Sequence, residues 1–202
     1  MKSLLISIQP KRCEKIAKRE ETIEVRKSRP KIETPFKAYI YCTKDNKTAF
    51  NNRNGNMFLS TKGWQDYSEC NGKVIGEFVC DEVYEWKYDY CDGVDIDDDL
   101  ILDTCLDRED INIYAKGKTL YGWHISDLKI YDNPKKLSEF RKACPDKFRY
   151  CEICKYGSVV LSPDEEEYAL YHGGHYDCFD TVCNNRVTRS PQSWCYVEEI
   201  DE

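Results

Sequence analysis

Apolar residues recur at every second position, or in short runs, in several segments of this 202-residue chain. Successive side chains of a β-strand point to opposite faces, so this period of two predicts strands with one buried face. Turn signals such as the Asn71–Gly72 pair separate the segments. Strands are expected at residues 4–8, 22–26, 36–42, 73–83, 120–131 and 193–200. The fold class is therefore expected to be α+β, and mainly β.

Helix signals lie between these segments. Pro10 suits the first turn of a helix, and Asp107 is placed to cap a second helix at residues 106–115. A third helix is expected at residues 137–143. Gly76 interrupts an apolar strand and is expected at a bulge or a tight bend. The first helix would bury Cys13, Ile16 and Ala17 and expose Lys11, Arg12, Lys15, Lys18 and Arg19.

The net charge of -7 is unevenly distributed along the chain. Residues 1–50 contain 13 Lys and Arg against 6 Asp and Glu, whereas residues 81–110 contain 13 acidic residues. A basic surface of limited size favours a bound phosphate or RNA, although a solvated helix surface would give the same count. The acidic run at residues 95–99 lacks the glycine and the glutamate of a calcium loop, and is expected to be a solvated loop.

No apolar run approaches the roughly 18 residues of a membrane span, and the run at residues 4–8 is short for a signal peptide. We therefore expect a cytoplasmic protein without a membrane partner. In a reducing compartment the 12 cysteines would be thiols or metal ligands, and a secreted disulfide framework is the alternative. Cys13, Cys42 and Cys80 are expected in the core.

A candidate zinc site lies in the cysteine-rich segment at residues 144–185. Cys151 and Cys154 have the spacing at which two thiolates reach one tetrahedral zinc ion. A structural zinc would stabilise a segment that has few large aliphatic residues, and free thiols are the alternative. The expected ligands are Cys144, Cys151, Cys154 and Cys183, with Cys178, His172 and His175 as alternatives.

Several segments, taken in order, resemble an ASCH (activating signal cointegrator homology) domain. They are the first strand and helix and residues 22–27, 73–79, 121–131 and 189–197. The chain particularly resembles the longer ASCH proteins of phages and of bacteria that carry them, which have a cysteine-rich insert before the final strand. The resemblance implies one PUA-like β-barrel over residues 1–202, with peripheral helices, residues 144–185 as the C-terminal insert, and a cleft for RNA or a nucleotide.

The family motif, Gly-x-Lys-x-x-Glu-x-Arg, falls on Arg19, Glu21, Glu24 and Arg26, and only the last two positions match. Relatives that hydrolyse acylated cytidine nucleosides are expected to use a lysine at the position of Glu21 and a threonine at the position of Glu24 as catalytic groups. A carboxylate does not simply replace a lysine that activates a hydroxyl group. The resemblance therefore favours binding, with amidohydrolysis as an alternative.

Arg26 is expected to hold a phosphate or a base edge through two hydrogen bonds, with Glu24 positioning it. A solvated ion pair is the simpler alternative for two residues on one strand face. Further basic residues would follow a nucleic-acid backbone, and aromatic rings would stack bases. The expected binding residues are Glu24, Arg26, Lys27, Lys37, Tyr41, Trp123 and Lys129.

His124 is the candidate catalytic residue, as a general base for RNA cleavage. Lys129 or Arg26 would stabilise the developing negative charge. A structural histidine is the alternative, and the sequence does not single out a second proton-transfer group. The expected function is RNA or nucleotide binding by a regulatory or accessory module. A ribonuclease, a nucleoside amidohydrolase, and a phage accessory protein that binds a host protein are the alternatives.

Overall fold

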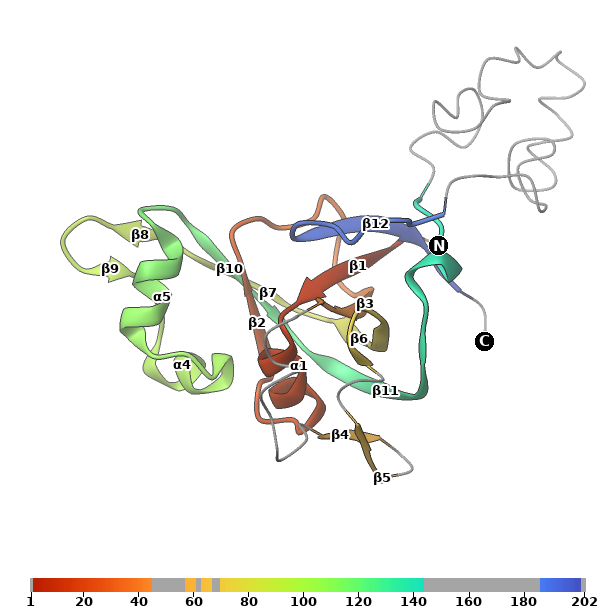
Figure 1. Cartoon of the computed structure of the whole chain (residues 1–202). Helices are drawn as coiled ribbons and strands as arrows, with labels where there is room; N and C mark the ends of the chain where they lie inside the picture. Colours follow the sequence, from red (N-terminus) through yellow and green to blue (C-terminus); the bar gives the residue numbers. More distant parts are fainter. Residues whose placement is uncertain (1, 45–56, 61–62, 67–69, 144–185, 201–202) are drawn as a thin grey trace, which may run out of the picture.

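The structure, a computed structural model, describes residues 2–44, 57–60, 63–66, 70–143 and 186–200. The strands of this part form a five-stranded sheet, a three-stranded sheet and two small hairpins (Figure 1). Three α-helices and one 3-10 turn accompany them within the same residues. The expectation of a mainly β chain with helices is confirmed. The cysteine-rich segment at residues 144–185 lies outside the described residues.

The five-stranded sheet contains both ends of the described chain. Its central pair, β1 and β3, runs parallel, and the other neighbouring strands run antiparallel. The order is β11 (Ser126–Lys135), β6 (Val74–Cys80), β3 (Phe36–Cys42), β1 (Lys2–Ile8) and β12 (Trp194–Glu198). Among the described strands, β11 and β12 are the two edges of this sheet, so their hydrogen bonds do not close the expected barrel.

Gly76 confirms the expected irregularity in β6. The pairing of β3 with β6 shifts register between Ile40 and Tyr41, next to the position of Gly76. A Cβ atom at Gly76 would lie 2.4 Å from the backbone oxygen of Lys129. Because backbone cannot move aside as a flexible side chain does, β6 and β11 approach closely only with glycine at this position.

The three-stranded sheet has the order β2 (Ile23–Arg26), β10 (Leu120–His124) and β7 (Val83–Trp86). The prediction of one strand over residues 120–131 is wrong, because β10 and β11 belong to different sheets. Between them, the Ile125 backbone N–H donates to the Thr22 oxygen at 2.8 Å. The apolar alternation continues through this break, so the period alone does not mark the change of sheet.

Helices α4 (Asp98–Thr104) and α5 (Arg108–Ala115) lie with the hairpin of β8 (Tyr88–Asp89) and β9 (Gly93–Val94), away from the five-stranded sheet (Figure 1). The cap at Asp107 is confirmed, since its carboxylate accepts a hydrogen bond from the Asp110 backbone N–H at 2.7 Å. A further hairpin consists of β4 (Met57–Ser60) and β5 (Gly63–Asp66).

Two local predictions are wrong. The acidic run is not a loop throughout, because α4 begins at Asp98, where aspartates in the first turn suit the helix dipole. The helix expected at residues 137–143 is only a 3-10 turn, Leu137–Glu139. The following backbone is extended and pairs with distant partners, Arg141 with Arg186 and Lys142 with Val197. A local sequence pattern does not identify partners that are distant in the chain.

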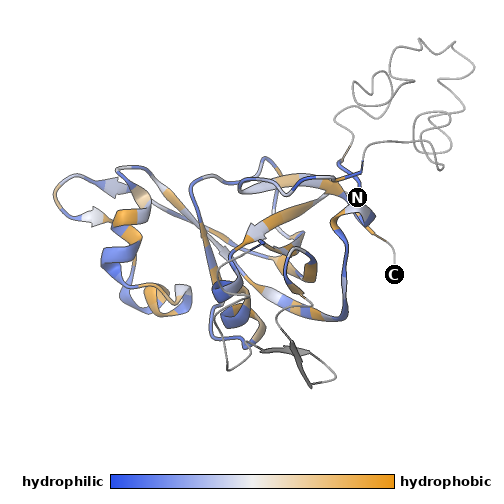
Figure 2. Ribbon diagram, viewed as in Figure 1, coloured by the Kyte–Doolittle hydropathy of each residue, from blue (hydrophilic) through white to orange (hydrophobic). Residues whose placement is uncertain are grey.

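Two separate cores flank the β2 strand. One packs α1 (Pro10–Ala17) against the five-stranded sheet, and the other packs the three-stranded sheet against α4 and α5. Hydrophilic colour dominates α1, while hydrophobic colour covers parts of the strands in the five-stranded sheet (Figure 2). Cys13, Cys42 and Cys80 are buried free thiols, as expected. No helix in the described part of the chain is long and apolar enough to cross a membrane.

Candidate functional site

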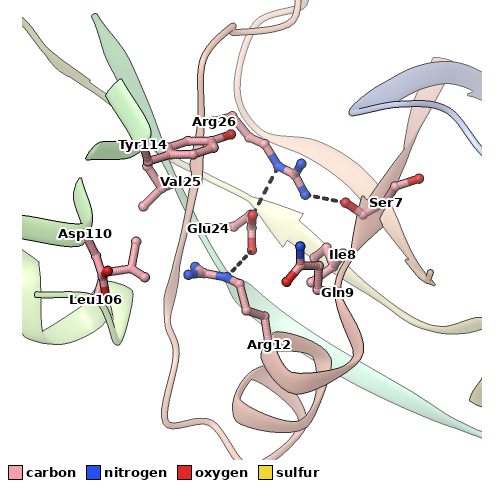
Figure 3. A pocket seen from close by; sticks show the side chains of 10 residues that line it. All are labelled: Ser7, Ile8, Gln9, Arg12, Glu24, Val25, Arg26, Leu106, Asp110 and Tyr114. Carbon is pink, nitrogen blue, oxygen red and sulfur yellow. Dashed lines mark hydrogen bonds and ion pairs between the residues drawn. The ribbon is translucent and has the colours of Figure 1, made fainter. Parts of the chain in front are cut away.

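A pocket of about 320 Å³ lies where the end of β1, the start of α1, strand β2 and helix α5 meet (Figure 3). Two arginines, one from a helix and one from a strand, contribute their guanidinium groups to it. We call it the arginine pocket. Its lining residues are Ser7, Ile8, Gln9, Arg12, Glu24, Val25, Arg26, Leu106, Asp110 and Tyr114.

Strand β2 places two charged side chains in this pocket. Ile23 and Val25 belong to the core beneath α4 and α5, so Glu24 and Arg26 point to the opposite face. All four residues of β2 are buried. The solvated ion pair that the sequence allowed is therefore excluded, and both charged groups depend on protein partners.

Arg26 is oriented from two sides. Its Nη2 donates a hydrogen bond to the backbone oxygen of Ser7 at 2.7 Å, and its Nε lies 3.1 Å from Oε1 of Glu24 (Figure 3). Its side chain is only 10% exposed. A guanidinium group that is fixed in this way presents its remaining donors in one direction, as recognition of a phosphate or carboxylate requires.

Arg12 reaches the same carboxylate from helix α1. Its Nε lies 3.8 Å from Oε2 of Glu24, so the Glu24 carboxylate stands between two guanidinium groups (Figure 3). Its Nη2 donates to Oε1 of Glu21 at 2.5 Å. Burial opposes the charged form of Arg12, but Glu24 and then Glu21 outweigh it and raise the Arg12 pKa.

Glu21 lies behind Arg12, and its side chain has no exposed surface. Burial, followed by the nearby Glu24 carboxylate, raises the pKa of Glu21 to about 9, against the opposing effect of Arg12. At neutral pH Glu21 therefore keeps its proton. Its Oε1 accepts the hydrogen bond from Arg12 in either protonation state.

An aromatic ring forms one wall of the arginine pocket. Tyr114 of α5 lies beside Arg26 (Figure 3), and burial raises the Tyr114 pKa. Lys27, which follows β2, places its Nζ 4.6 Å from the centre of this ring. An aromatic face next to two guanidinium groups can stack a base whose phosphate is bound.

The structure brings Glu24, Arg26 and, through Tyr114, Lys27 together. The other expected binding residues are not among the described residues that line the pocket. Lys37 pairs with Glu199 at 2.8 Å and Glu77 at 3.7 Å, on the five-stranded sheet. Tyr41 and Trp123 are buried in cores, and the Trp123 ring packs edge-on against Phe36. Lys129 is exposed on β11.

His124 is not among the residues that line the arginine pocket. In the β2–β10 ladder His124 pairs with Ile23. Its side chain therefore leaves the sheet on the face opposite to that of Glu24. Its Nδ1 lies 2.6 Å from Oδ1 of Asp81, and this hydrogen bond lowers the Asp81 pKa. The His124 side chain is 36% exposed. The aspartate engages one of the two ring nitrogens and so restricts the orientation of the ring.

The basic helix surface expected from the sequence is largely engaged with the protein itself. Lys18 pairs with Glu14 at 2.6 Å, and Lys15 donates to the backbone oxygen of Cys105 at 3.1 Å. Reasoning from the sequence grouped Arg12 with these lysines and missed its individual role. The one available signal was Glu21, an acidic residue of unexplained purpose within the motif. Nothing in the sequence indicated that Tyr114 and Asp110 would line the pocket.

The expected zinc ligands all lie outside the described residues. Among the residues that the structure does describe, no three His, Cys, Asp or Glu side chains gather closely enough to hold a metal ion. Zinc binding by residues 144–185 stays a prediction.

No family model matches the chain, and no curated protein matches it. Among solved structures, the ASCH protein of Zymomonas mobilis is similar at 14% identity, over 84% of this chain and 94% of that chain, with a TM-score of 0.44. One single-residue variant of it gives the same values. A second variant gives 13% identity, 67% and 76% coverage and a TM-score of 0.43. These are ASCH proteins, the family that the sequence resembles.

Proposed function

We propose that the chain is an ASCH-type accessory module that binds RNA or a nucleotide through a phosphate group held by Arg26. The observation that carries the proposal is the buried Arg26 guanidinium, which Ser7 and Glu24 orient within a pocket. Guanidinium groups bind phosphate oxygens through two parallel hydrogen bonds. Glu24 orients Arg26 and would accept hydrogen bonds from donors on the ligand.

The dimensions of the arginine pocket support one nucleotide as the occupant. Its volume of about 320 Å³ lies near the lower end of the range for small-molecule pockets, about 300–1,000 Å³. The Tyr114 ring offers a stacking surface beside the phosphate position, and Lys27 adds a cation near that ring. A nucleotide of a single strand fits these features, because its base is free to stack.

A binding titration tests the proposal. Fluorescently labelled single-stranded RNA of mixed sequence is titrated with wild type, Arg26→Gln and Arg189→Gln over a salt series. Arg189 is exposed and is not among the residues that line the pocket, so its variant removes the same charge without changing the lining. We expect Arg26→Gln to bind about 10- to 100-fold more weakly, as the loss of a charge-assisted contact implies, and Arg189→Gln to change little. Equal binding by wild type and Arg26→Gln would overturn the proposal.

A second candidate function, RNA cleavage, is favoured by the contact between Asp81 and His124. The 2.6 Å contact orients the ring as in a general base whose other nitrogen meets the substrate. The same labelled RNA is incubated with wild type, His124→Ala and Asp81→Asn. Shortened RNA that disappears in His124→Ala would establish this activity. Intact RNA with the wild type would reject it.

A further inference from the structure

We propose that Arg12 is a second ligand-binding residue of the arginine pocket. Glu21 positions Arg12 through a hydrogen bond, and a proton that Glu21 shares with Glu24 sets the charge of the site. The proposal rests on the proposed function, because it concerns the phosphate expected in the same pocket. It specifies the ligand group further, as a phosphate with a single negative charge, such as a phosphodiester.

Four ionisable residues form a row in which acids and bases alternate. Glu21 contacts Arg12 at 2.5 Å, and Arg12 lies 3.8 Å from Glu24. Glu24 in turn lies 3.1 Å from Arg26. Three of these residues, Arg12, Glu24 and Arg26, line the pocket, whereas Glu21 lies behind them. Glu21 therefore does not touch a ligand itself, and it acts through its hydrogen bond with Arg12 and through the net charge of the row.

A hydrogen bond between the carboxyl groups of Glu21 and Glu24 contributes to the raised pKa of Glu21. Oε2 of Glu21 and Oε2 of Glu24 are both buried, and neither accepts a hydrogen bond from a donor in the described part of the chain. Two buried acceptors without donors are costly. One proton between them satisfies both, with Glu21 as the donor and Glu24 as the acceptor.

The shared proton decides the charge of the row. With one proton, the two carboxyl groups carry a single negative charge against the two positive charges of Arg12 and Arg26. One positive charge is then left for a ligand, and a singly charged phosphate matches it. If both carboxyl groups were ionised, the row would be neutral and would hold an anion more weakly.

Arg12 is the more accessible of the two arginines. Its side chain is 21% exposed, compared with 10% for Arg26. Its Nε is a buried donor that lacks an aligned hydrogen-bond partner among the described residues. The Nη2 contact with Glu21 holds the guanidinium plane beside the pocket. Because Glu24 lies between the two guanidinium groups, a phosphate in the pocket would be bound by donors of both arginines that point away from this carboxylate.

The titratable groups around Glu21 come from three elements. Arg12 and Cys13 face it from α1, Glu24 from β2, and Cys105 from the end of α4. Burial raises the pKa of both thiols, so the cysteines stay neutral near neutral pH. Arg12 and Glu24 are therefore the charged groups that decide whether Glu21 holds its proton.

The test uses the dinucleotide dCpdC as the probe. Its phosphodiester keeps one negative charge, and its bases stay uncharged, between about pH 6 and pH 9.5. Calorimetric titrations compare wild type with Arg12→Gln, Glu21→Gln, Arg26→Gln and Lys11→Gln across this range. Lys11 is the matched control, since it is the exposed cation next to Arg12 on the same helix.

We expect Arg12→Gln to bind dCpdC about tenfold or more weakly, and Lys11→Gln to bind it within about twofold of wild type. Wild-type affinity should fall as the pH approaches about 9, where Glu21 loses its proton. Glu21→Gln keeps both hydrogen bonds and has no proton to lose. Its affinity should therefore stay at or above the wild-type value throughout the pH range.

Three outcomes separate the two proposals. Normal binding by Arg12→Gln together with lost binding by Arg26→Gln would overturn the role of Arg12 and leave the proposed function intact. A pH profile of Glu21→Gln that matches wild type would overturn the shared proton. Failure of wild type to bind both dCpdC and RNA would overturn the proposed function itself. If Arg12→Gln unfolds, the double variant with Glu21→Gln removes the unpaired carboxyl group and repeats the test.

Discussion

Raising the pH from 6 to 8 is expected to destabilise the protein through Glu21. The ordinary pKa of 4.5 rises to about 9 in the folded protein, because Glu21 is buried beside Glu24. Between these values the native state holds a proton that the unfolded chain has released. The stabilisation is therefore complete below pH 4.5 and is lost as the pH rises towards 9. Each pH unit in this window removes on the order of 1 kcal/mol, so the loss from pH 6 to pH 8 is roughly 2–3 kcal/mol.

Urea unfolding at several pH values, followed by tryptophan fluorescence, measures this effect. The informative quantity is the free energy of unfolding of Glu21→Gln minus that of wild type, because other titrating groups cancel in this difference. We expect the difference to increase by roughly 2–3 kcal/mol from pH 6 to pH 8. Glu20→Gln is the control, since Glu20 is exposed. A pH-independent difference for Glu21→Gln would show that Glu21 is ionised and would refute the shared proton.

Three further substitutions test the fold, and one tests the metal prediction. Trp123→Ala should lose about 3–5 kcal/mol of stability in urea unfolding, because the ring is fully buried against Phe36. Gly76→Ala should lose about 1–3 kcal/mol, because its Cβ meets the Lys129 backbone. Asp107→Ala should lose about 1 kcal/mol by removing the α5 cap, while Asp103→Ala in α4 should change little. Elemental analysis should find about one zinc per chain in wild type and less in Cys151→Ser.

The strands could be predicted because their signal is local. Strand β3 occupies Phe36–Cys42, as the alternation predicts, and Asp107 caps α5 because its chemistry requires only neighbours in sequence. The break at Ile125 and the extended backbone after Glu139 depend on partners far along the chain. Which sheet a strand joins is a long-range property, so the local pattern could not reveal the divided strand or the open sheet.

The candidate site could be predicted in part for a related reason. Glu24 and Arg26 are two positions apart on one strand, so their shared face follows from the sequence. Their burial does not, because Arg12 arrives from another element and Tyr114 from a helix about 90 residues later. Lys37 and Tyr41 are residue types that are common in binding sites. In the folded protein, however, Lys37 pairs with Glu199 and Tyr41 is buried in a core.

Stability and binding are linked in this site because both depend on the same row of charges. The row lies between two apolar cores, where an uncompensated positive charge is unfavourable for the empty protein. A ligand that supplies the missing negative charge relieves this cost and binds only the folded state. At a concentration 100 times its Kd, such a ligand raises the free energy of unfolding by about 2.7 kcal/mol. The proton that Glu21 keeps in the folded protein thus also leaves the positive charge that selects the ligand.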